Sequence, residues 1–120
     1  MIQLEGVVSD RGSRYAVSGV AVRSRAEVDA FIKALKKKSK YAKATHNTWA
    51  VILSDGGPIK NDDGESGAGA VILKMLDREA LHDVVVVVTR WLMAKVRPPS
   101  LEMAINTSVS RLLVGSFRRS

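Results

Sequence analysis

The residues with the clearest chemical potential gather in the segment 61–69, which reads NDDGESGAG. It brings three carboxylates, those of Asp62, Asp63 and Glu65, together with three glycines directly before an apolar run. Oxygen ligands this close in sequence suit a divalent cation, whereas glycine-rich backbone at the start of a helix suits a phosphate group. Two kinds of chemistry are therefore open at this segment, metal-assisted hydrolysis and phosphate binding.

Other features of the same segment argue against both chemistries. The spacing lacks the alternate acids and distant glutamate of a calcium loop, and no Lys-Ser or Lys-Thr follows the glycines as in a Walker loop. A long loop separates the segment from the preceding strand, unlike a dinucleotide-binding turn. The simpler interpretation is a polar loop whose Glu65 favours the next helix through its dipole. We therefore predict no catalytic residue, no metal and no cofactor.

The remaining candidates for catalysis are few. His46 and His82 are the only histidines, and cysteine is absent, so a zinc site would need carboxylate ligands and thiol chemistry is excluded. His46 lies in ATHNTW at the start of an expected strand, where we expect a hydrogen-bonded structural role. No serine lies in a G-x-S-x-G turn. These observations predict that the protein is not an enzyme.

A second feature is the lysine-rich segment KALKKKSKYAK. On an expected helix, one basic face opposite the apolar stripe collects Lys33, Lys36, Lys37 and Lys40. This face could bind nucleic acid by releasing counterions, contact an acidic protein, or serve only as solvated surface. Nearby aromatics are few for base stacking, namely Tyr41 and Trp49. Four arginines could extend the face if the fold brings them near: Arg11, Arg14, Arg118 and Arg119.

The elements that must position these residues follow the order ββαβαβα. The expected elements are strands at 2–8 and 15–22, a helix at 24–40, a strand at 45–54, a loop to 65, a helix from Ser66 or Gly67 to Glu79, a strand at 83–91 and a helix from Ser100 to Gly115. The unbroken valine run in the last strand predicts a central strand that is buried on both faces. We predict an α/β fold, a two-layer sandwich with the helices on one face of a mixed sheet.

Length and composition set the wider limits. The 120 residues predict one domain, 1–120, with an ordered core of about 2–115 and a basic C-terminal tail at 116–120. No window is apolar enough for a membrane span, and the N-terminus does not resemble a signal peptide, so a cytoplasmic location without membrane contact is expected. The net charge of +7 and the pI of about 10.1 favour acidic partners.

Several stretches together resemble the IMPACT/YigZ family, the ancient conserved (UPF0029-type) domain shared by bacterial YigZ-type proteins and the eukaryotic translation regulator IMPACT. They are ATHNTWA, DDGESGAGAVILKML, VVVVVTRW and the lysine-rich helix before them, within about 12–114. Arg90-Trp91 and Ile105-Asn106 look more like the eukaryotic branch. The resemblance implies a fold similar to the second domain of ribosomal protein S-five and no established enzymatic activity.

The resemblance also selects candidate residues. The positions that match the family's motifs, and that we predict form the rim of a polar groove, are Thr45, His46, Asn47, Trp49, Asp62, Asp63, Gly64, Glu65 and Arg90. One departure follows the arginine, where Met93, Ala94 and Pro98 stand in place of a glycine-rich stretch. Because side chains now occupy these positions, a contact built on those glycines is expected to be altered.

Taken together, the residues and the resemblance predict a non-enzymatic binding domain in the regulation of translation, with a protein or the ribosome as its partner. The first alternative is direct binding of RNA by the basic helix face. The second is a hydrolase or phosphoryl-transfer enzyme that would use Asp62, Asp63, Glu65 and His46 around a divalent ion.

Overall fold

The computed structural model describes residues 2–10, 13–92 and 101–113 of the 120-residue chain. Its elements are β1 Ile2–Asp10, β2 Ser13–Ala21, α1 Arg25–Lys37, α2 Ser39–Ala42, β3 His46–Leu53, β4 Gly57–Asn61, α3 Ala68–Arg78, β5 Val84–Leu92 and α4 Leu101–Leu112. The α/β class and the N-terminal hairpin are confirmed. The expected tail at 116–120 and the departures at Met93, Ala94 and Pro98 lie outside the described residues.

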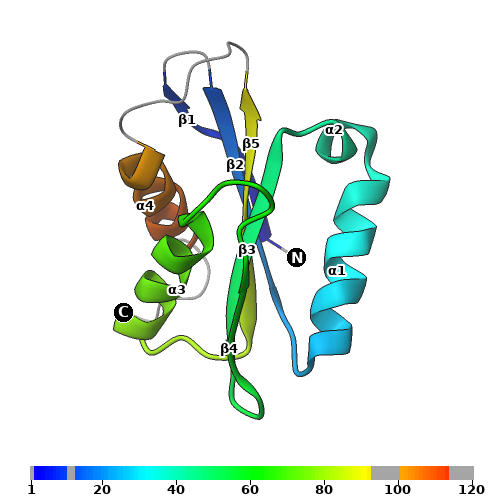
Figure 1. The fold of residues 1–120 in the computed structure, drawn as a ribbon, viewed down its shortest axis with the longest axis vertical. Helices are drawn as coiled ribbons and strands as arrows, with labels where there is room; N and C mark the ends of the chain where they lie inside the picture. Colours follow the sequence, from blue (N-terminus) through cyan, green and yellow to red (C-terminus); the bar gives the residue numbers. More distant parts are fainter. Residues whose placement is uncertain (1, 11–12, 93–100, 114–120) are drawn as a thin grey trace.

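The strands form one five-stranded sheet in the order β1-β2-β5-β3-β4 (Figure 1). The valine strand β5 is central and Val84–Val88 are buried, as the apolar run predicted. The mixed sheet was a wrong prediction, because every pair of described strands is antiparallel. The reason is topological: β2 and β3 run parallel to each other, but β5 inserts between them and is antiparallel to both.

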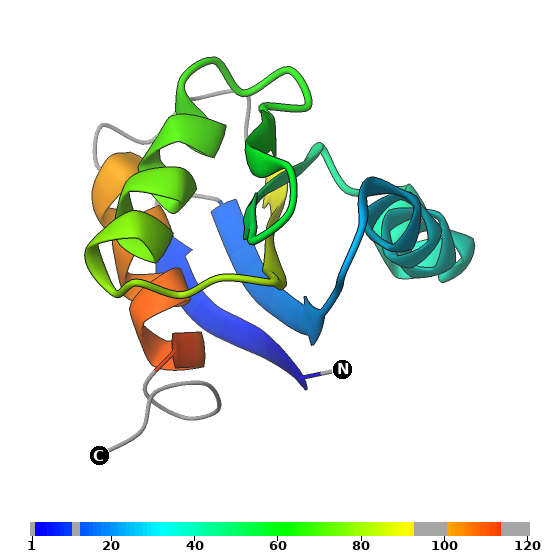
Figure 2. The ribbon, with the colours of Figure 1, turned by 90° about the horizontal axis from the view of Figure 1, so that it is seen from below.

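The helices cover both faces of the sheet, so the expectation that they share one face is wrong (Figures 1 and 2). α3 and α4 pack on one face against a core that includes Val86 and Val88, and α1 and α2 pack on the other against Val85 and Val87. Successive residues of a strand point to opposite faces. An all-valine strand therefore presents apolar surface in both directions, and each face needs a cover.

Two elements depart from the sequence-based expectation at residues that matter for the site. The expected loop after β3 contains β4, an edge strand in which Pro58 is tolerated. The expected helix at 24–40 divides, because Lys38 has an extended conformation (φ −74°, ψ 122°) that ends α1 and starts α2. Lys40 therefore belongs to α2 rather than to α1.

The N-terminal cap of α1 and the buried face of α4 agree with the sequence-based expectation. The Ser24 hydroxyl accepts a hydrogen bond from the Glu27 N–H at 3.2 Å and so caps α1. Ile105, Val109 and Leu112 of α4 are buried. Among the described residues, no helix has the length and apolar character needed to cross a membrane.

Candidate functional site

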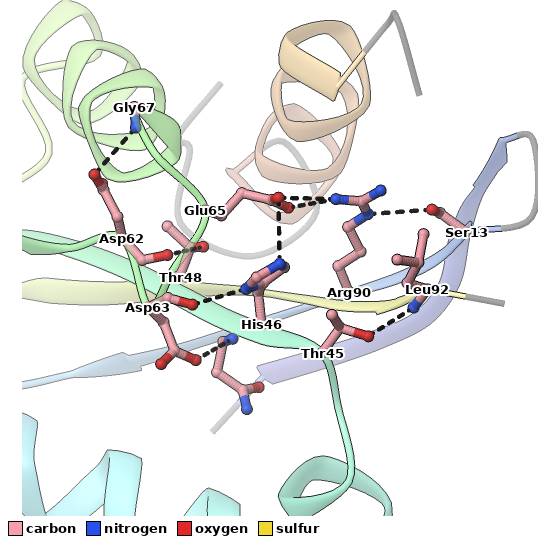
Figure 3. A network of polar contacts seen from close by, with 11 residues as sticks. Ser13, Thr45, His46, Thr48, Asp62, Asp63, Glu65, Gly67, Arg90 and Leu92 are labelled. Atoms are coloured by element: carbon pink, nitrogen blue, oxygen red, sulfur yellow. Dashed lines mark hydrogen bonds and ion pairs between the residues drawn. The ribbon is translucent and has the colours of Figure 1, made fainter. Parts of the chain in front are cut away.

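The carboxylate of Asp62 caps the N-terminus of α3. It accepts a hydrogen bond from the backbone N–H of Gly67 at 3.0 Å (Figure 3). It accepts a second one from the backbone N–H of Gly69 at 2.8 Å. These two backbone hydrogen bonds hold the pKa of Asp62 below its ordinary value of 3.8. A Cβ atom at position 69 would lie only 2.7 Å from the Asp62 carboxylate, so a larger residue there would displace the capping group. The protein's own carboxylate thus occupies the place that a bound phosphate would take.

The next residues fold the loop back onto β3. Asp63 has φ 50° and Gly64 φ 83°, a left-handed turn in which glycine avoids steric strain. The Asp63 carboxylate accepts from the Asn47 backbone N–H at 2.6 Å, and the Asp63 carbonyl oxygen lies 2.7 Å from His46 Nδ1. The Thr48 hydroxyl donates to the Asp62 carbonyl at 3.0 Å. The loop is therefore fixed by hydrogen bonds to the start of β3.

Glu65 forms the buried centre of the network. It is 6% exposed and pairs with Arg90, which is 3% exposed; Nη1 of Arg90 donates to both carboxylate oxygens, at 2.9 and 2.8 Å. His46 Nε2 lies 3.4 Å from Glu65, and Arg90 Nε donates to the Ser13 hydroxyl at 3.1 Å. Nη2 of Arg90 is buried without an acceptor among the described residues. The expectation that Glu65 serves the α3 dipole is wrong, because Asp62 caps α3 and Glu65 balances Arg90.

The other predicted residues lie around this network. Asn47 is buried on the α1 side; its side chain donates to the Tyr41 carbonyl at 3.1 Å and accepts from Thr89 at 2.8 Å. Trp49 is buried on the same side, and the guanidinium of Arg25 lies 5.4 Å from its ring centre. The exposed Thr45 accepts from the Leu92 N–H at 2.9 Å. Nearly all of these polar groups therefore have partners inside the protein.

The arrangement does not favour a metal centre. Asp62 faces α3, Asp63 faces the backbone of β3, and Glu65 faces Arg90, so the three carboxylates do not converge (Figure 3). Within residues 2–10, 13–92 and 101–113, no group of three or more metal-ligating side chains is placed to hold an ion. The metal-assisted enzyme considered above thus has no support in this geometry.

The basic residues form a separate, outward-facing site. We define the lysine surface as the exposed residues Lys33, Lys36, Lys37, Lys38, Lys40 and Lys43. Lys40 lies over the ring of Trp91, with its ammonium 5.3 Å from the ring centre, and the Trp91 indole donates to the Lys40 carbonyl at 2.9 Å. Arg14 of β2 is exposed and stands opposite Trp91 in the sheet register, so it extends this surface. Arg11, Arg118 and Arg119 lie outside the described residues.

A cleft joins the two sites between α1 and the strands β3 and β4. It has a volume of about 230 Å³, and its lining comprises Arg25, Asp29, Ile32, Lys33, Lys36, Asn47, Trp49, Asn61 and Asp63. Three of the predicted groove residues, Asn47, Trp49 and Asp63, thus share a wall with two predicted lysines. A larger hollow, about 680 Å³, lies between α3 and α4 and contains none of the predicted residues.

Sequence reasoning missed several residues of these sites. Ser13 was unmarked, because its contact with Arg90 joins residues 77 positions apart. Arg25 and Asn61 were also missed, although they line the cleft. Lys38 and Lys43 belong to the same lysine-rich segment. They would have been included if all the lysines of the segment had been counted, rather than only those on one helical face.

The chain is similar to known proteins over most of its length. The family model described as the Impact N-terminal domain matches residues 11–112. The Protein IMPACT homolog of Caenorhabditis elegans is 38% identical over 92 residues, which cover 71% of this chain and 36% of that protein. The homolog of Saccharomyces cerevisiae is 34% identical over 90 residues, which cover 70% of this chain and 34% of that protein. The chain thus spans about a third of the length of these relatives.

Two solved structures resemble the fold. One, a crystal structure of a hypothetical protein, superposes with a TM-score of 0.79 at 20% identity, over 93% of this chain and 57% of the other. The second is the two-domain translational regulator Yih1, with a TM-score of 0.58 at 29% identity, over 95% of this chain and 45% of the other. The first similarity concerns the fold alone.

Proposed function

Because the chain belongs to the IMPACT family, the family of the Impact N-terminal domain, we propose that it is a non-enzymatic binding domain in the regulation of translation. Its relatives include proteins named IMPACT and the translational regulator Yih1. We propose that it acts in the cytoplasm by contacting the ribosome or a ribosome-associated protein.

The observation that carries this proposal is that the acidic residues of the loop are paired inside the protein, whereas most lysines of the lysine surface are not. The carboxylates of the loop have partners inside the protein, which leaves them unsuited to chemistry on a substrate. Lys33, Lys36, Lys37, Lys38 and Lys43 form no ion pair within the part of the chain that the structure describes. The ammonium groups of these five lysines are therefore available for an acidic partner.

The cleft extends this contact surface. Lys33 and Lys36 form its rim, and Asn47 and Asp63 lie in its wall. We assign five other predicted residues, His46, Asp62, Gly64, Glu65 and Arg90, to holding the loop that shapes this wall. Binding then depends directly on the lysines and indirectly on the network.

Co-sedimentation with purified ribosomes tests the proposal. The wild-type protein should pellet with ribosomes at low salt, and a Lys33→Glu/Lys37→Glu variant should remain in the supernatant. Lys74→Glu/Arg78→Glu is the matched control, because these exposed residues have the same i, i+4 spacing on α3, across the sheet. Equal pelleting of both variants, or none by the wild type, would contradict a ribosome contact through this surface.

A further inference from the structure

We propose that the lysine surface binds the phosphate backbone of double-helical RNA. This inference rests on the proposed function and specifies the chemistry of the partner. It assigns the contact to nucleic acid rather than to an acidic protein, and to a duplex rather than to a single strand.

The charge of the protein is concentrated in this one place. The six lysines lie within eleven residues, and no acidic residue occurs between Asp29 and Asp55. Since the formal net charge is +7, the segment accounts for six of the seven net charges and the rest of the chain is nearly balanced. One-sided charge of this kind is the electrostatic footprint of a nucleic-acid-binding protein.

The type of cation favours a phosphate-bearing partner over the core of a protein–protein interface. The cores of protein–protein interfaces are enriched in arginine, aromatic residues and methionine and depleted in lysine. The segment from residue 33 to 43 contains six lysines and no arginine, and its one aromatic, Tyr41, is 2% exposed. A lysine ammonium is a compact point charge that suits phosphate groups without a demand for bidentate geometry.

The aromatic side chains distinguish a duplex from a single strand. Proteins that bind single strands stack bases on exposed aromatic rings. Here Tyr41 and Trp49 are buried, and Trp91 packs edge-on against Tyr41 with Lys40 over its ring. In the part of the chain that the structure describes, the only large apolar residue that is exposed is Met103, on α4 across the sheet. Double-helical RNA needs no stacking platform, because it is recognised through its shape and its backbone.

The shape of the surface also suits a backbone contact. Lys33 and Lys37 are one helical turn apart on α1, which places their Cβ atoms about 5 to 6 Å apart. After the break at Lys38 the chain enters α2, which lies beyond the end of α1 (Figure 1). Lys40 of α2 and Lys43 directly after it therefore continue the charge. Arg14 extends it from the sheet. The charges therefore spread over two helices and a strand, as contacts with several phosphates require.

Fluorescence anisotropy tests the inference with a labelled RNA duplex of about 16 base pairs, the length that double-stranded RNA-binding modules span. The probes for comparison are one strand of this duplex alone, a DNA duplex of the same sequence, and vesicles containing anionic lipid. The variants are Lys33→Ala/Lys37→Ala and the control Lys74→Ala/Arg78→Ala, which remove the same charge from opposite sides of the sheet. Thermal melting checks that both variants fold.

The expected result is binding of the RNA duplex that weakens as salt rises from about 50 to 200 mM. Each lost phosphate contact should reduce the slope of log K against log salt by about 1. The Lys33→Ala/Lys37→Ala variant should therefore lose about 2 from this slope, and the control variant nothing. The single strand and the vesicles should bind more weakly than the RNA duplex, and the DNA duplex should not exceed it.

Tighter binding of the single strand, of the vesicles or of the DNA duplex would overturn the inference, and so would equal salt slopes for the two variants. Its failure can be distinguished from failure of the proposed function. Lysine-dependent pelleting with ribosomes, without binding to the RNA duplex, would retain the ribosome contact and assign it to ribosomal protein. Duplex binding without pelleting would retain the inference and reject the ribosome contact.

Discussion

Charge serves opposite purposes in two regions of this protein. At the start of β3 and α3, the buried Glu65 and Arg90 form an ion pair, and Asp62 neutralises a helix end. On α1 and α2, six exposed lysines stand together with no acidic residue in their segment. The charges of the first region have partners inside the protein and stabilise the fold, whereas the charges of the second are suited to a partner outside the protein. Substitutions in the first region should therefore change stability, and those in the second should change binding.

The largest expected effect is in the buried pair. Glu65→Ala should lower the free energy of unfolding by about 3 to 5 kcal/mol, because it leaves the Arg90 guanidinium buried without its carboxylate. Urea unfolding measures this loss. A Glu65→Leu/Arg90→Met double variant should be more stable than Glu65→Ala, because it removes both charges and refills the space. If Glu65→Ala costs less than about 1 kcal/mol, the pair does not organise the loop.

The cap of α3 should have an intermediate effect. Asp62→Ala removes the acceptor for two backbone N–H groups and should cost about 1 to 2 kcal/mol in the same measurement. Gly69→Ala should destabilise the wild type, because its Cβ would displace the capping carboxylate. In the Asp62→Ala background its cost should shrink, since the carboxylate is gone and alanine favours helix. Equal costs in both backgrounds would refute the close contact.

Lowering the pH should weaken the stabilising effect of the same helix cap. The pKa of Asp62 is lower in the folded protein than its ordinary value of 3.8, because two backbone N–H groups bind the ionised form. Its contribution to stability is therefore complete above the unfolded pKa and is lost as the pH falls towards the folded pKa. Asp62→Asn should lose less stability than the wild type as the pH falls below about 4. Parallel stability curves for the two proteins in acid would contradict this assignment.

The smallest effect on stability is expected on the lysine surface. Lys33→Ala/Lys37→Ala should change the free energy of unfolding by less than about 0.5 kcal/mol, because both side chains are exposed and without ion pairs among the described residues. Thermal unfolding of this variant beside the wild type measures the change. A large loss of stability would mean that these lysines have a structural role, and the contrast between the two regions would fail.

Several elements were predictable because their signals are local. The Ser24 cap and the apolar stripe of α1 follow from helical spacing, and the central place of β5 follows from its valine run. The edge strand β4 was not predictable in this way. Its five residues include Pro58, and only pairing with β3 makes them a strand. The division between α1 and α2 at Lys38 likewise has no strong local signal.

The candidate residues show the same difference between local signals and contacts that form only in the folded chain. The sequence by itself determined that this is an α/β protein of the IMPACT family with a concentrated basic segment, because these properties depend on composition, local spacing and motif. Only the tertiary structure decided that Asp62 rather than Glu65 caps α3, and that Glu65 meets Arg90 and, through it, Ser13. The contacts of Arg90 with Glu65 and with Ser13 join residues 25 and 77 positions apart, and the antiparallel insertion of β5 between β2 and β3 brings them together.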